Sequence, residues 1–576
     1  MAMKKMLSFF KGNIKETILA PLFKLFEALM DLFVPLVVAY IINEGLADKD
    51  LSQIYKATGL LMLLAILGML FSFTAQYFAA NASVSYAGKL RQALFEHIQT
   101  LSYRELDRLG TDTLITRLSS DVNQVQNGLN LALRLLLRSP FIVFGAMIMA
   151  FTIDIRSALI FLITIPILAA VVYFIMLKSI PLYTKAQESL DSLTKHTREN
   201  LDGVRVIRAF NHEKEEIRVF NEKSETITKI NEAVGSLSAY MNPLTYTIVN
   251  IATIILIRNG ATYVNNGSLS QGNVVALYNY MAQIIVELIK LASLTITINR
   301  SLACARRIND VFEIETSITY KEEEVRNSDS EYKVEFENVS FAYGNESEDA
   351  ISDISFKVKD KETIGIIGGT GSGKSTIINL IPRFYDVNNG IVKVDGLDVK
   401  EYPAGELIDR IGIVPQKAVL FSGTIRENLK WGNEKASDEE LYEALRAAQA
   451  MEVVEGKSDG LNEMVEQGGR NFSGGQRQRL TIARALIKKP EILILDDSAS
   501  ALDFVTDYKL RKAISKLDMT IFIVSQRSSS VMNCDRIIVM DDGKLAGFDD
   551  HKTLLKENSV YQEIYYSQFP EEVHDE

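Results

Sequence analysis

Charged residues are absent from long stretches in the first half of the chain. These charge-free runs are 57–88, 139–153, 157–177, 233–257 and 259–286. A helix needs about 20 mostly apolar residues to cross the hydrocarbon core of a bilayer. Most of these runs are therefore long enough to span a membrane. The last run is broken by Asn265-Asn266-Gly267-Ser268, which indicates a turn between two spans.

Two spans carry charges. Residues 17–43 form an apolar segment that contains Lys24, Glu27 and Asp31. The run 139–153 becomes a full span if it begins near Leu131 and includes Arg134 and Arg138. With these two, the pattern predicts six membrane-spanning helices in residues 1–320.

Lys and Arg predict which side of the membrane each connection occupies. The connections 89–130 and 178–232 are rich in both, whereas the loop after the first span is acidic. Positive connections stay in the cytoplasm, so we expect a multi-pass protein of the plasma membrane with both termini cytoplasmic. Disulfides are rare in that compartment, and we expect none between Cys304 and Cys534.

The two cytoplasmic connections are too long to be simple loops. Apolar residues recur at helical spacing through Leu90, Leu94 and Leu101, and again from Ile217 to Ile230. This predicts helices that continue beyond the bilayer, with turns near 110–112 and 202–203. They could form a stalk, or a lever that touches another domain.

The second half of the chain has a different composition. Residues 1–330 carry 32 Lys and Arg against 30 Asp and Glu, and residues 331–576 carry 30 against 43. Over the whole chain, 47% of the 576 residues are hydrophobic and 23% are charged, which excludes a collagen, a disulfide scaffold and wholesale disorder. A basic surface for nucleic acid is also absent. We predict a membrane domain at 1–320, a linker at 321–331 and an α/β domain at 332–576.

The α/β domain begins with a glycine-rich phosphate loop. The apolar strand 363–367 leads directly into G-x-x-x-x-G-K-S, followed by a helical pattern. The glycines let backbone N–H groups approach phosphate, the lysine reaches the β and γ oxygens, and the serine can ligate Mg²⁺. The residues expected to bind ATP here are Gly368, Gly369, Thr370, Gly371, Ser372, Gly373, Lys374, Ser375 and Thr376.

Two later motifs extend this prediction. The apolar strand 492–495 ends in Asp496, and such a carboxylate holds Mg²⁺ in phosphate-loop proteins. Between the phosphate loop and this strand lies Phe472-Ser473-Gly474-Gly475-Gln476, at the start of a helix, which is a second surface suited to an anion. One chain needs one phosphate cradle for one ATP, so this second surface suggests the ATP of another chain.

Together these motifs resemble an ATP-binding cassette, and with six preceding spans the whole chain resembles an ABC exporter half-transporter. Gln416 in Val414-Pro415-Gln416 and Asp503 in Ser500-Ala501-Leu502-Asp503 fit the same pattern. The resemblance implies ATP and Mg²⁺ as cofactors, with Mg²⁺ near Ser375, Gln416 and Asp496. It also implies adenine stacked on Tyr343 and coupling helices at 110–121 and 200–213.

The chain departs from the family at two chemical positions. The family places Glu after the strand aspartate and His after a later strand, whereas this chain has Asp497 and Gln526. Asp is one methylene shorter, and Gln cannot carry the charge of an imidazolium. The pattern resembles the degenerate-site subunit of bacterial heterodimeric multidrug exporters, whose signature 472–476 would complete a competent site on a partner bearing Glu and His. Alternatively, Asp497 and Gln526 still align a water molecule.

The intramembrane charges bear on what is carried. Glu27, Asp31 and Glu287 are candidate contacts for a hydrophobic or cationic amphipathic substrate, because buried charge in a membrane is costly. The alternative is internal pairing, for example of Asp31 with Arg138.

Two other functions remain open. One is a nucleotide-sensing regulatory subunit that does not transport, and the other is a homodimeric lipid or peptide exporter.

Overall fold

The computed structural model describes residues 6–321, 330–344, 348–498 and 501–570. Contacts divide the chain into two compact units. The membrane unit comprises Met1–Gln99 and Gly110–Ile314, and the nucleotide unit comprises Thr100–Leu109 and Glu315–Glu576. Most of the predicted linker, and Ser500, lie outside the described residues.

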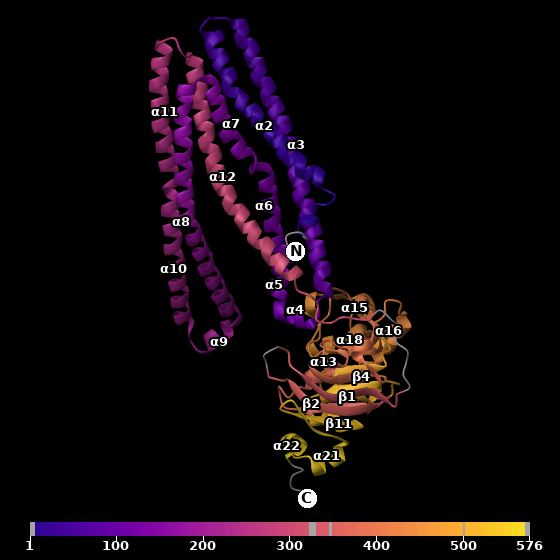
Figure 1. Cartoon of the computed structure of the whole chain (residues 1–576). Coiled ribbons are helices and arrows are strands. Elements are labelled where there is room, and N and C mark those ends of the chain that lie inside the picture. The colour runs from indigo at the N-terminus through magenta and orange to yellow at the C-terminus, as the bar shows by residue number, and fades with distance from the viewer. Residues whose placement is uncertain (1–5, 322–329, 345–347, 499–500, 571–576) are drawn as a thin grey trace. The chain divides into compact units, whose positions relative to one another are not determined.

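The membrane unit is all helical (Figure 1). In chain order its elements are α2 (Ile14–Tyr40), the π-helical turn η1 (Ile41–Leu46), α3 (Leu51–Thr100), α5 (Thr111–Thr116), the π-helical turn η2 (Arg117–Asp121), α6 (Val122–Leu135), α7 (Arg138–Ile153), α8 (Ile155–Asp202), α9 (Val204–Ala209), α10 (Glu213–Ala239), α11 (Met241–Asn265) and α12 (Gln271–Phe312). Among the described residues, six helical segments are long and apolar enough to cross a membrane. The six predicted spans are therefore confirmed.

Two of the helices are also much longer than the thickness of a bilayer, as expected. α3 has 50 residues and α8 has 48, so each is about 70–75 Å long at 1.5 Å per residue. A hydrocarbon core is only about 30 Å thick. α8 ends at Asp202, and Gly203 leads into the short helix α9, so the turn predicted at 202–203 is confirmed.

The turn predicted at 110–112 is confirmed at Gly110, and the chain has an earlier break that was not predicted. α3 ends at Thr100 and a separate helix α4 (Tyr103–Leu109) follows, whereas 110–121 continues helically towards α6. The backbone N–H and hydroxyl of Ser102 both bond to the carboxylate of Glu105, which starts α4. Gly110, at φ 73°, makes the second corner. The prediction found the corner at Gly110 and missed the break at 101–102.

The third span is interrupted rather than continuous. α6 stops at Leu135 and α7 begins at Arg138, between the two arginines that the sequence placed in one helix. Pro140 explains the break, because it has no N–H to donate to the carbonyl of Leu136 and its ring crowds that carbonyl.

The nucleotide unit contains two larger sheets and a two-stranded one (Figure 1). The first sheet is antiparallel, in the order β2 (Ile351–Lys359), β1 (Tyr332–Phe341), β4 (Asn389–Val394), β5 (Leu397–Asp398). The second runs β12 (Lys544–Asp549), β11 (Arg536–Asp541), β3 (Thr363–Gly368), β10 (Thr520–Val524), β9 (Ile492–Asp496), β6 (Ile411–Val414). It is parallel except for β12, and β7 (Gly423–Thr424) pairs with β8 (Met464–Val465).

Helices cover these sheets and complete the α/β fold that the sequence predicted. They are α13 (Lys374–Leu380), α14 (Glu406–Arg410), α15 (Ile425–Lys430), α16 (Asp438–Ala447), α17 (Met451–Glu455), α18 (Gly474–Ile487), α19 (Phe504–Ile514), α20 (Ser528–Val531), α21 (His551–Glu557) and α22 (Ser559–Gln568). Short 3₁₀ turns lie at η3 (Val399–Glu401), η4 (Gly460–Asn462) and η5 (Gln467–Gly469).

The parallel register decides where chemistry can occur. Val524 of β10 lies beside both Asp496 of β9 and Ile366 of β3. The inner strands are buried and almost wholly apolar, as is typical of a sheet covered on both faces. Their polar residues are therefore gathered where the strands end, at one edge of the sheet.

Candidate functional site

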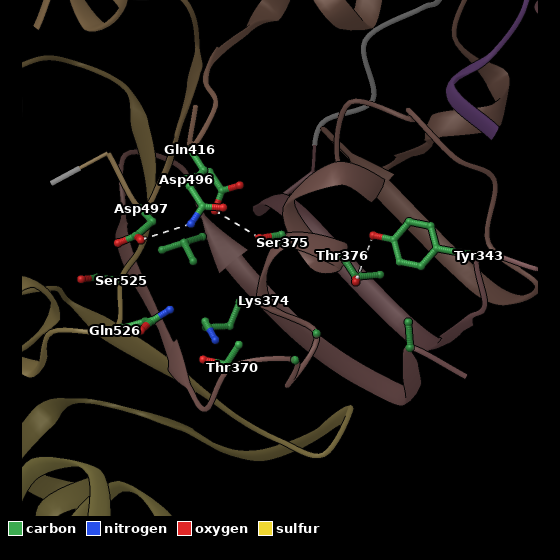
Figure 2. A pocket seen from close by; sticks show the side chains of 14 residues that line it. Tyr343, Thr370, Lys374, Ser375, Thr376, Gln416, Asp496, Asp497, Ser525 and Gln526 are labelled. Atoms are coloured by element: carbon green, nitrogen blue, oxygen red, sulfur yellow. Dashed lines mark hydrogen bonds between the residues drawn. The ribbon is translucent and has the colours of Figure 1, made fainter. Parts of the chain in front are cut away.

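A cavity of about 330 Å³ opens at this edge of the parallel sheet (Figure 2). It is lined by residues that follow β3, β6, β9 and β10, together with residues near β1 and β2. The lining residues are Tyr343, Ala350, Thr370, Gly371, Gly373, Lys374, Ser375, Thr376, Gln416, Asp496, Asp497, Val524, Ser525 and Gln526. The fold thus brings the phosphate loop, Gln416, Asp496 and the two departing positions together.

The phosphate loop wraps around its own lysine. The Lys374 ammonium group donates to the carbonyl oxygens of Gly368, at 3.0 Å, and of Gly369. Burial lowers the pKa of Lys374, and the Asp497 and Asp496 carboxylates oppose that shift. A Cβ at Gly373, where φ is 94°, would lie 2.5 Å from the side chain of Ile351. Only glycine fits there, so the loop keeps its backbone N–H groups accessible to phosphate.

The residues predicted to hold Mg²⁺ lie together. Ser375 Oγ donates to Asp496 Oδ1 at 3.2 Å, and Gln416 Nε2 donates to Asp497 Oδ2 at 3.5 Å. Burial raises the pKa of both aspartates. Hydroxyl, carboxylate and amide oxygens are hard ligands that suit Mg²⁺, which binds few protein ligands when phosphates supply the rest. Among the described residues, no group of three or more His, Cys, Asp and Glu side chains could hold a metal ion.

The two departing residues are both at the cavity. Asp497 adopts a left-handed backbone, at φ 44°, and its N–H donates to Val524 O at 3.0 Å. The Gln526 side chain lies near Lys374, at the same end of the cavity as Asp497 (Figure 2). The backbone carbonyl of Gln526 accepts from Gln568 Nε2 of α22 at 2.9 Å, and Gln568 Oε1 accepts from Ser528 N. The helix α22 thus holds the segment that carries Gln526.

Tyr343 lies at the far end of the cavity from Asp497 (Figure 2). Its hydroxyl is 3.2 Å from Thr376 Oγ1. Its ring meets Phe341 and Tyr385 edge-on, with centroids 4.9 and 5.2 Å apart. The side chain remains 43% exposed, so the ring is anchored and still accessible to a flat partner.

The signature residues do not line this cavity. Among its described lining residues none comes from 472–476. Ser473 Oγ accepts from Gln476 N at 3.3 Å, and Gln476 Oε1 accepts from Ser473 N at 2.9 Å, which is a capping box for α18. Phe472 is buried. The capping box explains Ser473 and Gln476 structurally, and their action on a second nucleotide stays a prediction.

Asp503 likewise has a structural contact. Its carboxylate accepts from Val505 N and Thr506 N at 3.1 and 2.9 Å and caps α19. These backbone bonds, that from Thr506 above all, lower the pKa of Asp503. Its assignment to the ATP-binding-cassette pattern is compatible with this contact and stays a prediction.

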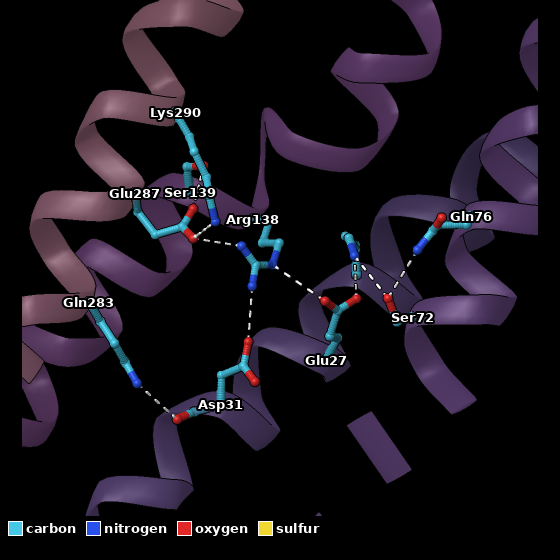
Figure 3. Close-up of polar contacts among 10 residues, drawn as sticks. Glu27, Asp31, Ser72, Gln76, Arg138, Ser139, Gln283, Glu287 and Lys290 are labelled. Atoms are coloured by element: carbon cyan, nitrogen blue, oxygen red, sulfur yellow. Dashed lines mark hydrogen bonds and ion pairs between the residues drawn. The ribbon is translucent and has the colours of Figure 1, made fainter. Parts of the chain in front are cut away.

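Six of the intramembrane charges form one connected cluster (Figure 3), namely Lys24, Glu27, Asp31, Arg138, Glu287 and Lys290. Arg138 contacts Glu287 Oε1 at 2.7 Å, Asp31 Oδ2 at 2.9 Å and Glu27 Oε1 at 3.8 Å. Lys24 pairs with Glu27, and Lys290 lies 2.9 Å from Glu287 Oε1. The expected pairing of Asp31 with Arg138 is therefore confirmed, and a single guanidinium joins α2, α7 and α12.

The three carboxylates differ in exposure. The side chain of Asp31 is 44% exposed, against 14% for Glu27 and 5% for Glu287. Asp31, Arg138, Gln283 and Glu287 line a cavity of about 490 Å³, which Glu27 does not reach. Of the three predicted substrate contacts, Asp31 is the one most accessible from that cavity.

Sequence reasoning missed a pair of residues near Tyr343. Tyr385 OH donates to Asp107 Oδ2 at 2.6 Å, although the two are 278 positions apart. The aromatic pair Phe384-Tyr385, shortly after the phosphate-loop helix, was the available signal. Its partner in α4 could not be found without the fold.

Comparisons with known proteins agree with this geometry. Residues 17–288 match the family described as ABC transporter transmembrane region, and residues 351–500 match the family described as ABC transporter. The chain is 35% identical over 570 residues to the "Uncharacterized ABC transporter ATP-binding protein YfiB" of Bacillus subtilis (strain 168), covering 99% of both chains.

Two other relatives carry more specific names. The chain is 31% identical over 579 residues to the "Putative multidrug export ATP-binding/permease protein YgaD" of the same organism, covering 98% of both. It is 32% identical over 490 residues to the "ATP-dependent lipid A-core flippase" of Desulfotalea psychrophila (strain LSv54 / DSM 12343), covering 83% of this chain and 84% of that one.

The fold is similar to that of a solved structure, a bacterial Atm1-family ABC exporter with ATP bound. The TM-score is 0.81 at 22% identity, over 97% of this chain and 99% of the other.

Proposed function

The chain belongs to the ABC transporters. We propose that it is one half of an ATP-driven exporter of hydrophobic or amphipathic compounds. It would lie in the plasma membrane with both termini in the cytoplasm. The observation that carries the proposal is the cavity that gathers Lys374, Ser375, Gln416 and Asp496 at one sheet edge.

Each of these residues has a role in that proposal. Lys374 would neutralise the β and γ oxygens of ATP, and its bond to the Gly368 carbonyl holds its ammonium group at the phosphate loop. Ser375, Asp496 and Gln416 would hold Mg²⁺, which supplies charge neutralisation at the phosphates. Tyr343 presents its ring to the adenine, because its hydroxyl is fixed on the phosphate-loop helix.

We further propose that this chain's own site hydrolyses ATP slowly. Asp497 is shorter than the family's glutamate, and a misplacement of about 1 Å can cost about 100-fold in rate. Gln526 can donate a hydrogen bond but carries no charge. The signature at 472–476 would then complete a competent site on a different half-transporter, and this chain's site would mainly hold ATP.

Asp31 is the proposed contact for a cationic substrate group. Arg138 also contacts Glu287 and Glu27, so Asp31 can leave it without leaving a buried charge unpaired, which is the costly outcome. The names of two relatives, one of multidrug export and one of a lipid flippase, both concern export or lipid movement. Cationic amphipathic drugs fit Asp31 and its cavity.

The test is ATP turnover by the complex purified from its own membrane and reconstituted in liposomes. Asp497→Glu combined with Gln526→His should raise turnover, because both chemical positions are restored. An unchanged rate would contradict the impaired-site assignment. Drug addition should change turnover, whereas turnover that no added drug changes would favour the regulatory alternative.

The lipid flippase relative supports a second candidate, a homodimeric lipid exporter. Asp31→Asn distinguishes the two. It should weaken stimulation by cationic drugs more than stimulation by an uncharged lipid analogue if the first proposal holds.

A further inference from the structure

One short helix of the first half of the chain packs inside the nucleotide unit. This is α4, which belongs with residues 315–576 by its contacts. The Tyr103 ring lies 4.4 Å from the Phe384 ring and 6.2 Å from the Tyr385 ring, centroid to centroid. Ser102 Oγ is 2.9 Å from Ser317 Oγ. Along the chain, α4 connects α3 directly to α5, so its position is tied to two helices of the membrane unit.

The segment that receives α4 is firmly held. Arg383 is only 4% exposed and adopts φ 57°, a left-handed conformation that is costly for a side chain of this size. Its guanidinium donates to Asp386 Oδ1 at 2.7 Å and to Thr319 O at 3.1 Å. These bonds fix the backbone on either side of Phe384 and Tyr385. A displacement of one ring is therefore passed to its neighbours rather than absorbed by a loose loop.

Tyr385 touches both the candidate adenine site and α4. Its ring meets the Tyr343 ring at 86° with centroids 5.2 Å apart, an edge-to-face arrangement that aromatic pairs prefer. Its hydroxyl donates to Asp107 Oδ2 of α4 at 2.6 Å. The Tyr343 hydroxyl in turn lies 3.2 Å from Thr376 in the helix that begins with Lys374. The chain of contacts runs from the phosphate-loop helix through Tyr343 and Tyr385 to Asp107.

We propose that Tyr385 is a positioning residue that couples a purine base stacked on Tyr343 to the docking of α4. The inference rests on the proposed function, because it requires a nucleotide at Tyr343. A base on the open face of Tyr343 restricts that ring, and the ring's other contacts with Tyr385 then hold the Tyr385 hydroxyl against Asp107. By reciprocity, a firmly docked α4 strengthens binding of the base.

The hydroxyl of Tyr385 remains a donor throughout the physiological pH range. Burial raises the pKa of Tyr385 well above its usual value, and the Asp107 carboxylate raises it further. A neutral hydroxyl that donates to a carboxylate makes a charge-assisted bond, which is stronger than a bond between neutral groups. The contact therefore responds to the base and not to pH.

The test measures hydrogen exchange of the peptide that covers 103–109, in the full complex in lipid nanodiscs. The two ligands compared are a non-hydrolysable ATP analogue and inorganic tripolyphosphate, which offers the phosphates without the base. In the wild type, we expect the ATP analogue to slow exchange in 103–109 about fivefold, at the lower end of usual coupling between sites. Tripolyphosphate should leave it unchanged.

Four variants isolate the bond. Tyr385→Phe keeps the ring and Asp107→Ala removes the acceptor, so each should abolish the nucleotide-dependent protection, and the double variant should lose nothing more. Asp107→Asn retains an acceptor oxygen and should keep part of the nucleotide-dependent protection. The matched control is Tyr402→Phe, which removes a hydroxyl bonded to Val394 O elsewhere in this unit and should respond like the wild type.

The outcomes separate this inference from the proposed function. The ATP analogue could bind with an affinity that depends on Lys374 without changing the hydrogen-exchange rate of 103–109. That result refutes the coupling through Tyr385 and leaves the ATP site in place. Equal protection by tripolyphosphate, or full protection in Tyr385→Phe, also refutes the coupling. If neither ligand binds, the proposed function itself fails.

Discussion

Replacing Arg138 by methionine gives a sharp test of the intramembrane cluster. Arg138 is 11% exposed and Glu287, its partner at 2.7 Å, is 5% exposed. Removing one member of a buried pair costs about 3–5 kcal/mol, because the other charge is left unpaired. Glu27 retains Lys24, and Asp31 is partly exposed, so the penalty falls mainly on Glu287, which keeps only the 44% exposed Lys290 and the Ser139 hydroxyl as partners.

This reasoning predicts a recovery in a double variant. Arg138→Met with Glu287→Met leaves no buried charge without a partner, since Lys290 is 44% exposed. Replacing a whole buried pair by apolar residues is often close to neutral. Asp31→Asn, which leaves Arg138 with two carboxylates, should cost no more than about 1 kcal/mol, as for an exposed ion pair.

The assay is thermal unfolding of the detergent-solubilised protein, followed by the loss of monodisperse material on size exclusion. Arg138→Met should lower the midpoint by about 5 °C or more, and the double variant should return close to the wild type. The reasoning is refuted if Arg138→Met is no less stable than Asp31→Asn, or if the second substitution deepens the loss.

Three more predictions concern the nucleotide unit. Burial raises the pKa of Asp497 in the folded state. The protonated carboxyl group therefore stabilises the fold fully below the ordinary Asp pKa of about 4, and this stabilisation is lost as the pH rises through the raised pKa. The stability of Asp497→Asn relative to the wild type, from denaturant unfolding without nucleotide, should accordingly grow from pH 4 upward, and a constant difference would contradict this. Burial raises the pKa of the Cys534 thiol to about 12, so at pH 8 a maleimide should label it only after unfolding, as mass spectrometry of its peptide would show. Ser473→Ala removes the cap of α18 and should cost about 1 kcal/mol, whereas Ser473→Asn, which can still cap, should cost less in the same unfolding assay.

The sequence was most informative where the chemistry is local. Gly368–Ser375 and Asp496 were recognisable because a phosphate loop and a strand-end carboxylate are each encoded in a few consecutive residues. The parallel register then placed Asp497 and Gln526 in the same cavity, as their positions after buried strands implied. Most of the six spans followed from charge-free runs whose lengths match a bilayer, and the other two from apolar segments that carry a few charges.

The sequence did not reveal features that depend on contacts between distant residues. It also did not reveal two breaks at which a stronger neighbouring pattern hid the signal of one residue. Tyr385 and Asp107 meet only because α4 packs beside the segment after α13. The break before α4 was missed because Gly110 is a stronger turn signal than Ser102, although the Ser102–Glu105 contact lies at the start of the helix. Pro140 was overlooked as a break because apolar residues continue on both sides of it.

The measurement that tests the central claim most directly is the native mass of the tagged chain, extracted as a complex from its own cell membrane. One chain has a mass of 64.5 kDa. We predict a complex with one copy of a second, different half-transporter, whose sequence carries Glu and His where this chain has Asp497 and Gln526. A complex of two identical chains would contradict the asymmetric account and leave hydrolysis to Asp497 and Gln526 themselves.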